Sequence, residues 1–262
     1  MINLSPTIAG IHFPFCLMNA AGACSTSREE LLALAHSESG AVVTKSITPE
    51  SFLDPGACCG LENPGHEYYV ELLPELRRAG KPVIASVAGL TLEEFILVAQ
   101  ALAAARADLI EINLNDPHVH THLSPFSSAG RLGEIVSVIR HKVSAPLAVK
   151  LPPTVSLPLP DIAAALLDAG IPVAICHNTP ANGRLSQAET ILQASDGRLD
   201  VIGVGGVASG AEALAVLRRG IKAIQIGSAV VKEGVGVFAR LKRELADSLE
   251  SRESTKGPVG TR

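Results

Sequence analysis

The 262-residue sequence predicts a closed (β/α)8 barrel, the TIM-barrel fold, with an N-terminal strand pair covering the bottom of the barrel. Eight short runs rich in valine and isoleucine are bounded by Gly, Pro or Asp, as expected for strands buried on both faces. Helical patterns alternate with these runs along most of the chain. Eight such units in one domain-sized chain favour a closed barrel over its rival, an open doubly wound sheet.

The expected elements follow one another in strand–helix order. The strands are the apolar runs at residues 16–19, 41–46, 83–87, 109–114, 147–151, 173–176, 201–204 and 223–226. The clearest helical patterns cover residues 28–36, 92–106, 132–142, 161–169 and 211–219. Thr26 and Thr91 precede acidic first turns, which is typical of capped helix starts. Gly170 and Gly220 stand where glycine caps end helices.

Two segments lie outside this repeat. Residues 2–13 are expected to form a small strand pair at the bottom of the barrel. Residues 251–262 are polar and contain Gly and Pro, which predicts a disordered tail. One barrel domain is therefore expected over residues 1–250.

Composition excludes several classes of protein. With 22 basic and 26 acidic residues and only 3% aromatic residues, the chain lacks the features of a nucleic-acid-binding protein. No apolar stretch is long enough to span a bilayer and no signal peptide opens the chain, so we expect a cytoplasmic protein without membrane contact. The five cysteines show no CxxC spacing, which predicts neither a disulfide framework nor a zinc site.

Glycines after the last two strands predict a phosphate site. Gly203, Gly205 and Gly206 follow the seventh strand, and Gly227-Ser228 follow the eighth. Glycines let backbone N–H groups approach an anion, and the loops after these two strands are the usual phosphate site of such barrels. The alternative is that the glycines only form tight turns. Two successive clusters at the two expected strands favour phosphate.

Two strands end in lysines, Lys45 and Lys150. A lysine at a strand end is often a surface group whose stem lies along apolar residues. At the open end of a barrel, both lysines would instead point their positive charge at the rest of the ligand whose phosphate is bound there. A flavin suits this arrangement because its reduced ring carries negative charge, and Asn113 and Asn178 would complete a polar wall.

Several motifs, in order, carry a resemblance to a known family: Asn19-Ala20-Ala21-Gly22, Val43-Thr44-Lys45-Ser46-Ile47-Thr48, Glu67-Tyr68-Tyr69, Ile112-Asn113-Leu114, Val149-Lys150-Leu151-Pro152-Pro153, Ile202-Gly203-Val204-Gly205-Gly206 and Gln225-Ile226-Gly227-Ser228-Ala229. The chain resembles the dihydroorotate dehydrogenase family, in particular its soluble class 1 members, over nearly its whole length. The resemblance implies a barrel that binds FMN and oxidises (S)-dihydroorotate to orotate in pyrimidine biosynthesis, with hydride transfer to N5 of FMN.

The resemblance assigns the cofactor site with few departures. It implies FMN contacts at Ala20, Gly22, Lys45, Ser46, Asn113, Lys150, Gly205, Gly206, Gly227 and Ser228. Lys150 would face the pyrimidine edge of the flavin, and Gly206, Gly227 and Ser228 would hold the phosphate. A further Gly-rich segment of the family is missing, because residues 182–199 are too few to contain it.

The substrate site departs further from the family. The pocket asparagine that grips orotate in the family is Ala57 here, whereas Asn63, Asn178 and Thr179 remain as substrate-binding candidates. The family's Cys or Ser base is replaced by Asp116. His118 replaces a substrate-binding asparagine. With Lys45, these two residues are the catalytic candidates.

The identity of the base stays open. A carboxylate with an unperturbed pKa of about 3.9 can accept a proton at neutral pH, but it is a weak base and repels an anionic substrate. His118, His120 and His122 have ordinary pKa values closer to neutrality. Their alternate spacing also permits a metal site, although a base or anion-binding role is the better hypothesis and we expect no metal.

Three hypotheses follow. The protein is a divergent FMN-dependent dihydroorotate dehydrogenase, an FMN oxidoreductase acting on another small substrate, or a non-catalytic flavin-binding homologue. Retention of Lys45, Lys150 and Asn113 favours the two enzymes. The resemblance also implies a homodimer and leaves open the electron acceptor, which is fumarate or a partner electron-transfer subunit in class 1 relatives.

Overall fold

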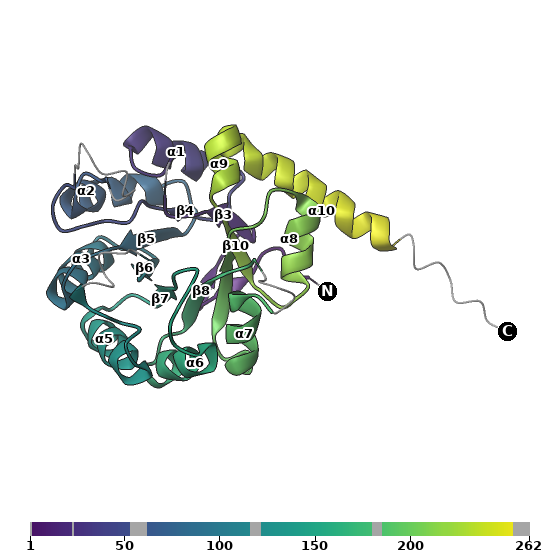
Figure 1. Cartoon of the computed structure of the whole chain (residues 1–262). Helices are drawn as coiled ribbons and strands as arrows, with labels where there is room; N and C mark the ends of the chain where they lie inside the picture. The colour runs from purple at the N-terminus through teal and green to yellow at the C-terminus, as the bar shows by residue number, and fades with distance from the viewer. Residues whose placement is uncertain (1, 23, 53–61, 116–121, 180–184, 254–262) are drawn as a thin grey trace.

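The computed structural model describes residues 2–22, 24–52, 62–115, 122–179 and 185–253. Eight parallel strands form one sheet in the order β3-β10-β9-β8-β7-β6-β5-β4. Their bounds are β3 (Leu17–Asn19), β4 (Val42–Val43), β5 (Val83–Val87), β6 (Leu109–Asn113), β7 (Leu147–Lys150), β8 (Val173–His177), β9 (Asp200–Val204) and β10 (Ala223–Ile226). The sheet curls into a nearly closed barrel inside a ring of helices, which confirms the predicted fold class (Figure 1).

The seam of the barrel lies between β3 and β4, the two end strands of the sheet order. The Asn19 side chain bridges it: Nδ2 donates to the Val43 carbonyl at 2.6 Å, and Oδ1 accepts from the Val43 N–H at 2.9 Å. The Gly40 N–H also donates to the Leu17 carbonyl at 2.7 Å. A buried side-chain amide therefore takes over the hydrogen bonds that a strand partner would make.

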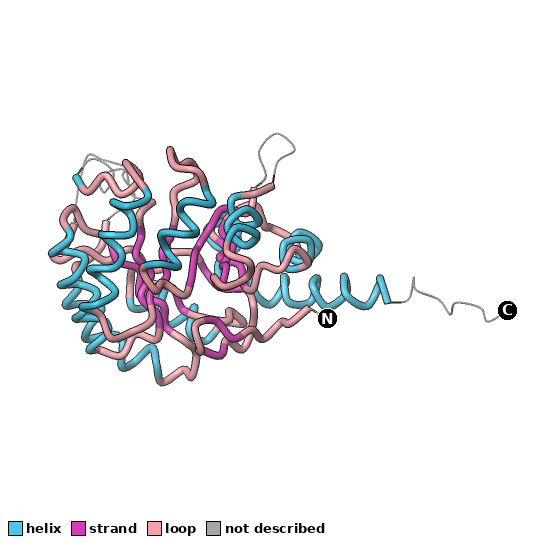
Figure 2. The backbone as a smooth tube through the Cα atoms, turned by 90° about the horizontal axis from the view of Figure 1, so that it is seen from below, coloured by secondary structure: helices cyan, strands magenta, loops and turns pink. Residues whose placement is uncertain are grey.

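Helices surround the strands on the outside of the barrel, as the view from below also shows (Figure 2). They are α1 (Arg28–His36), α2 (His66–Arg77), α3 (Leu92–Ala104), α5 (Ala129–Lys142), α6 (Leu159–Asp168), α7 (Gln187–Ala194), α8 (Gly210–Leu217), α9 (Ser228–Glu233) and α10 (Val237–Glu253), with a 3-10 turn η1 (Gly234–Gly236). Serines with glutamates three positions later form capping boxes at the starts of α1, α7 and α8. None of the described helices has the length and apolar character needed to cross a membrane.

The N-terminal strand pair closes the bottom of the barrel, as predicted. β1 (Thr7–Ile8) and β2 (Ile11–His12) pair in antiparallel fashion. Ile8 and Phe13 are fully buried in the apolar cluster of the barrel interior. The Ala9 N–H donates to Oδ2 of Asp200, at the start of β9, at 2.8 Å. The pair therefore fills the amino-terminal end of the barrel and leaves the carboxyl-terminal end as the mouth.

Element boundaries differ from the sequence prediction by up to three residues, including the ends of β4 and α10. Strand β4, predicted at residues 41–46, ends at Val43 instead of residue 46, because an extra residue interrupts its pairing: Val43 pairs with Ile84, but Ile47 pairs with Val87. Helix α10 continues to Glu253, three residues into the predicted tail, and residues 254–262 lie outside the described part of the chain.

Candidate active site

Interior side chains change from apolar to polar along the barrel. The lower part is lined by Ile8, Phe13, Met18, Ala41, Val43, Ile84, Leu109, Ala148, Val173, Ile175, Ile202, Val204 and Ala223. Because side chains alternate along a strand, residues two positions further on share the same interior face. These positions include the buried polar residues Ser86, Glu111, Lys150 and Gln225. Polar chemistry is therefore concentrated towards the mouth, the usual site of function in this fold.

Glu111 is the centre of a buried hydrogen-bonded ring that joins four strands. Its Oε1 accepts from Ser86 Oγ at 3.0 Å and from Lys150 Nζ at 3.2 Å. Its Oε2 accepts from Gln225 Nε2 at 2.7 Å, and Gln225 Oε1 accepts from Lys150 Nζ at 3.2 Å. Glu111 is fully buried and the Lys150 side chain is 6% exposed, so this ion pair is shielded from water.

A second branch of the network reaches the predicted cofactor residues Ser46 and Asn113. The hydroxyls of Ser46 and Ser86 lie 3.1 Å apart, and Asn113 Nδ2 donates to Ser46 Oγ at 2.8 Å. The structure therefore links Ser46, Asn113 and Lys150 through Ser86 and Glu111. Ser86 and Glu111 were not predicted from the sequence as site residues. A glutamate inside an otherwise apolar strand is nevertheless unusual and could have indicated the site.

The irregular end of β4 positions Lys45. Its N–H donates to the Ser25 carbonyl at 2.8 Å, while the preceding Thr44 N–H continues the strand pairing by donating to the Ile84 carbonyl at 3.0 Å. Thr44 Oγ1 in turn accepts from the Ser86 N–H at 3.1 Å. An extra residue at a strand end re-aims side chains. Lys45 is only 7% exposed, so it is not an ordinary surface lysine.

The ends of β8 and β9 meet through side chains that rest on glycines. A Cβ added at Gly203 would lie 1.9 Å from Asn178 Oδ1, and one at Gly206 would lie 2.8 Å from Thr179 Oγ1. Asn178 Nδ2 donates to the Gly205 carbonyl at 3.2 Å. Gly205 and Gly206 both have positive φ, at 80° and 70°, so the backbone turns here in a conformation that favours glycine. The predicted substrate pair and the predicted phosphate loop are therefore in contact.

Two buried polar atoms at this edge have no hydrogen-bond partner among the described residues: His177 Nε2 and Asn178 Oδ1. Buried polar atoms are normally paired, so two adjacent orphans mark this edge as a place where the described residues leave hydrogen-bonding capacity unused. Burial lowers the pKa of His177, and the positive charge of Lys150 lowers it further. Sequence reasoning missed His177.

The lowered pKa of His177 predicts a pH dependence of stability. Because the folded protein binds this proton less readily than the unfolded chain, the free energy of unfolding should fall as the pH drops below the unfolded value of 6.5. We expect wild type to lose more stability between about pH 7.5 and about pH 5.5 than His177→Gln, measured by urea unfolding of apoprotein. An equal loss in both proteins would contradict this assignment.

The loops after β3 and β10 complete the mouth. The Ala20 N–H donates to the Ile226 carbonyl at 2.9 Å, and Ser25 Oγ donates to the Gly22 carbonyl at 2.9 Å. Gly227 is the N-cap of α9, and Ser228 is its first residue. A Cβ added at Gly22 would meet nothing within 4 Å, and one at Gly227 would meet only Ala20 Cβ, at 3.8 Å. These backbones are therefore left uncovered at the mouth.

Three predicted site residues remain, of which the structure describes only Asn63. Asp116 and His118, two of the catalytic candidates, lie outside the described residues. Asn63 is buried, and its side-chain amide makes local hydrogen bonds. Oδ1 accepts from the Gly65 N–H at 2.9 Å, and Nδ2 donates to Thr48 Oγ1 at 2.9 Å. Its proposed contact with substrate stays a prediction.

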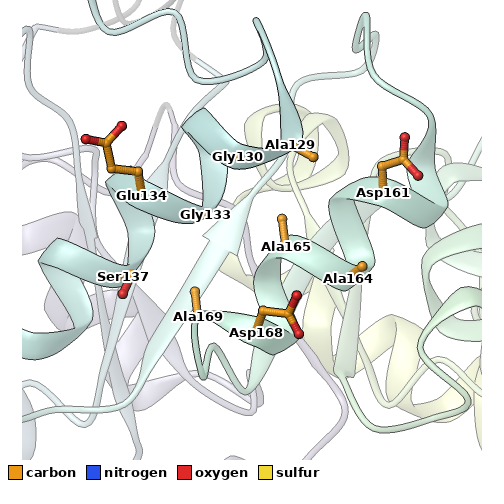
Figure 3. A pocket seen from close by; sticks show the side chains of 10 residues that line it. All are labelled: Ala129, Gly130, Gly133, Glu134, Ser137, Asp161, Ala164, Ala165, Asp168 and Ala169. Atoms are coloured by element: carbon orange, nitrogen blue, oxygen red, sulfur yellow. The ribbon is translucent and has the colours of Figure 1, made fainter.

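A groove of about 590 Å³ lies on the outer wall between α5 and α6, away from the mouth (Figure 3). Small residues line it, including Gly133, where an added Cβ would lie 3.8 Å from the Ala165 carbonyl oxygen. Its polar side chains include Glu134, Asp161 and Asp168. It contains no residue of the polar network and is not the candidate active site.

The family model of dihydroorotate dehydrogenase matches residues 3–197 and 185–249. The chain belongs to the dihydroorotate dehydrogenase family. Membership confirms the resemblance described above and makes the protein a dihydroorotate dehydrogenase-like oxidoreductase.

Several dihydroorotate dehydrogenase relatives share nearly the full length of the chain. A protein of Streptococcus agalactiae described as a putative dihydroorotate dehydrogenase A (fumarate) is 31% identical, covering 94% of this chain and 94% of its own. A protein of Thermoplasma acidophilum described as the catalytic subunit of dihydroorotate dehydrogenase B (NAD(+)) is 29% identical, covering 92% of each chain. The ligand-free dihydroorotate dehydrogenase structure from Eimeria tenella shares the fold, with a TM-score of 0.80 at 19% identity over 95% of this chain and 88% of that one.

Proposed function

We propose that the protein is an FMN-dependent dihydroorotate dehydrogenase that oxidises (S)-dihydroorotate to orotate in pyrimidine biosynthesis. The observation that carries the proposal is the mouth itself, where an uncovered glycine backbone lies in one ring of strand ends with two buried lysines and two orphaned polar atoms. These features suit a ligand with a phosphate at one end and a polar, planar ring at the other.

The residues present fit FMN. Gly206, Gly227 and Ser228 would hold the phosphate through backbone N–H groups. The space beside Gly227 is open, since an added Cβ there would meet only Ala20 Cβ at 3.8 Å, whereas Gly206 lies against Thr179 in a left-handed conformation that favours glycine. The remaining contacts would come from Ala20, Gly22, Lys45, Ser46, Asn113, Lys150 and Gly205. When bound, FMN supplies the acceptor for the hydride that leaves C6 of dihydroorotate.

Side chains of the protein would bind the substrate and accept its proton. Asn178 and Thr179 would hold the substrate by hydrogen bonds, and the burial of Lys45 would strengthen its attraction for an anionic substrate. The proton at C5 would pass to Asp116 or to His118. We further propose a cytoplasmic homodimer, whose reduced cofactor is reoxidised by a small acceptor or by an electron-transfer partner.

An anaerobic titration of purified protein with dihydroorotate tests this function. We expect a yellow protein whose visible flavin absorbance bleaches in proportion to added substrate, and Asp116→Asn and His118→Ala then identify the base by their rates of bleaching. A yellow protein that stays yellow would support a flavin oxidoreductase for another substrate, and the replacement of the pocket asparagine by Ala57 is the observation that favours that second candidate. A colourless protein that does not take up added FMN would overturn the cofactor assignment.

A further inference from the structure

The buried ring around Glu111 holds the ammonium group of Lys150 in one place. Lys150 Nζ donates to Glu111 Oε1 and to Gln225 Oε1, each at 3.2 Å, and these acceptors come from different strands, β6 and β10. An ammonium group has three N–H donors. The described residues therefore engage two of the three and leave one for a ligand at the mouth.

Glu111 is buried beneath its hydrogen-bond partners and does not face a ligand itself. Both carboxylate oxygens are taken, by Ser86, Lys150 and Gln225, and the residue is fully buried. The negative charge of Glu111 nevertheless lies beside the positive charge of Lys150, 3.2 Å away. A buried charge pair is screened little by solvent, so each charge modifies the field that the other exerts nearby.

We propose that Glu111 is a positioning residue that acts through Lys150: it fixes the Lys150 ammonium group and balances its charge, and thereby sets the reduction potential of the flavin. The inference rests on the proposed FMN site. Reduced flavin carries negative charge that oxidised flavin lacks, so the net charge of the Glu111–Lys150 pair decides how strongly reduction is favoured.

Single and double substitutions separate this role from a structural one. Glu111→Gln keeps an oxygen for Lys150 but removes the negative charge, so reduced FMN should gain about tenfold in affinity relative to oxidised FMN, a rise in potential of about 30 mV. Lys150→Gln removes the positive charge and should lower the potential by a similar amount. The double variant again has a neutral pair, so its potential should return close to that of wild type. A purely structural role would not produce opposite shifts that cancel.

The measurement is the two-electron potential of the FMN-loaded proteins, by dye equilibration during slow anaerobic reduction, together with the dissociation constant of oxidised FMN. Glu134→Gln is the matched control, because Glu134 forms an exposed ion pair with Arg131 on α5; its potential should equal that of wild type. An unchanged or lower potential in Glu111→Gln would overturn the inference, and so would a double variant whose potential stays as high as that of Glu111→Gln. If wild-type protein does not bind FMN at all, the proposed function fails instead.

Discussion

Replacing Glu111 by alanine is expected to lower the free energy of unfolding by about 3–5 kcal/mol, because removal of one partner leaves the other buried charge uncompensated. The substitution strands the Lys150 ammonium group in the barrel and removes the acceptor of Ser86 and Gln225. Urea unfolding of apoprotein, followed by circular dichroism, measures the effect without any contribution from bound FMN.

The control is Glu134→Ala, which breaks an ion pair of similar length, 2.8 Å, at a side chain that is 62% exposed. Surface pairs contribute about 0–1 kcal/mol, so this variant should unfold close to wild type. Similar losses in the two variants would show that water reaches Glu111 and that the ring is not a buried electrostatic unit.

Gly206→Ala is expected to weaken FMN binding by about 10- to 100-fold, or about 1.4–2.8 kcal/mol. The new Cβ would lie 2.8 Å from Thr179 Oγ1, and the β-branched side chain of Thr179 has few alternative positions. The phosphate loop and the substrate pair would both be displaced. Fluorescence titration of apoprotein with FMN measures the change.

Gly197→Ala is a close control for this substitution. Gly197 has the same φ of 70°, but an added Cβ there would meet nothing within 4 Å, and the residue lies between α7 and β9, before the strand and away from the mouth. Both variants pay the cost of a left-handed alanine, about 1–2 kcal/mol of stability. Only Gly206→Ala should lose FMN affinity, and an equal loss in both would mean that the effect is general destabilisation.

The architecture was predictable because its signals are local. Strands buried on both faces appear as short apolar runs, and β5 and β10 match their predicted bounds. The end of β4 was not predictable in this way. The extra residue before Ile47 leaves the apolar pattern intact and becomes visible only in the pairing with β5.

The site was predictable only where a residue type is itself informative. Glycines and strand-end lysines carry such information, and the structure places Gly206 and Lys150 at the mouth. The role of Glu111 depends on partners from three other strands, which no pattern within one strand encodes. The base stays a prediction, since Asp116 and His118 lie outside the described residues.

The Asn19 seam also has a consequence for the order in which the chain is assembled. The ladder partner of β3 is β10, from the far end of the sequence, whereas its hydrogen bonds to β4 itself come from the side-chain amide of Asn19. During synthesis, β3 leaves the ribosome long before β10 exists, and vectorial folding can pair the strands from β4 to β9 first. Until translation passes Ile226, both β3 and β9 have a bare backbone edge. Until the last strand emerges, the incomplete barrel therefore presents two unpaired edges at which another chain can add a strand.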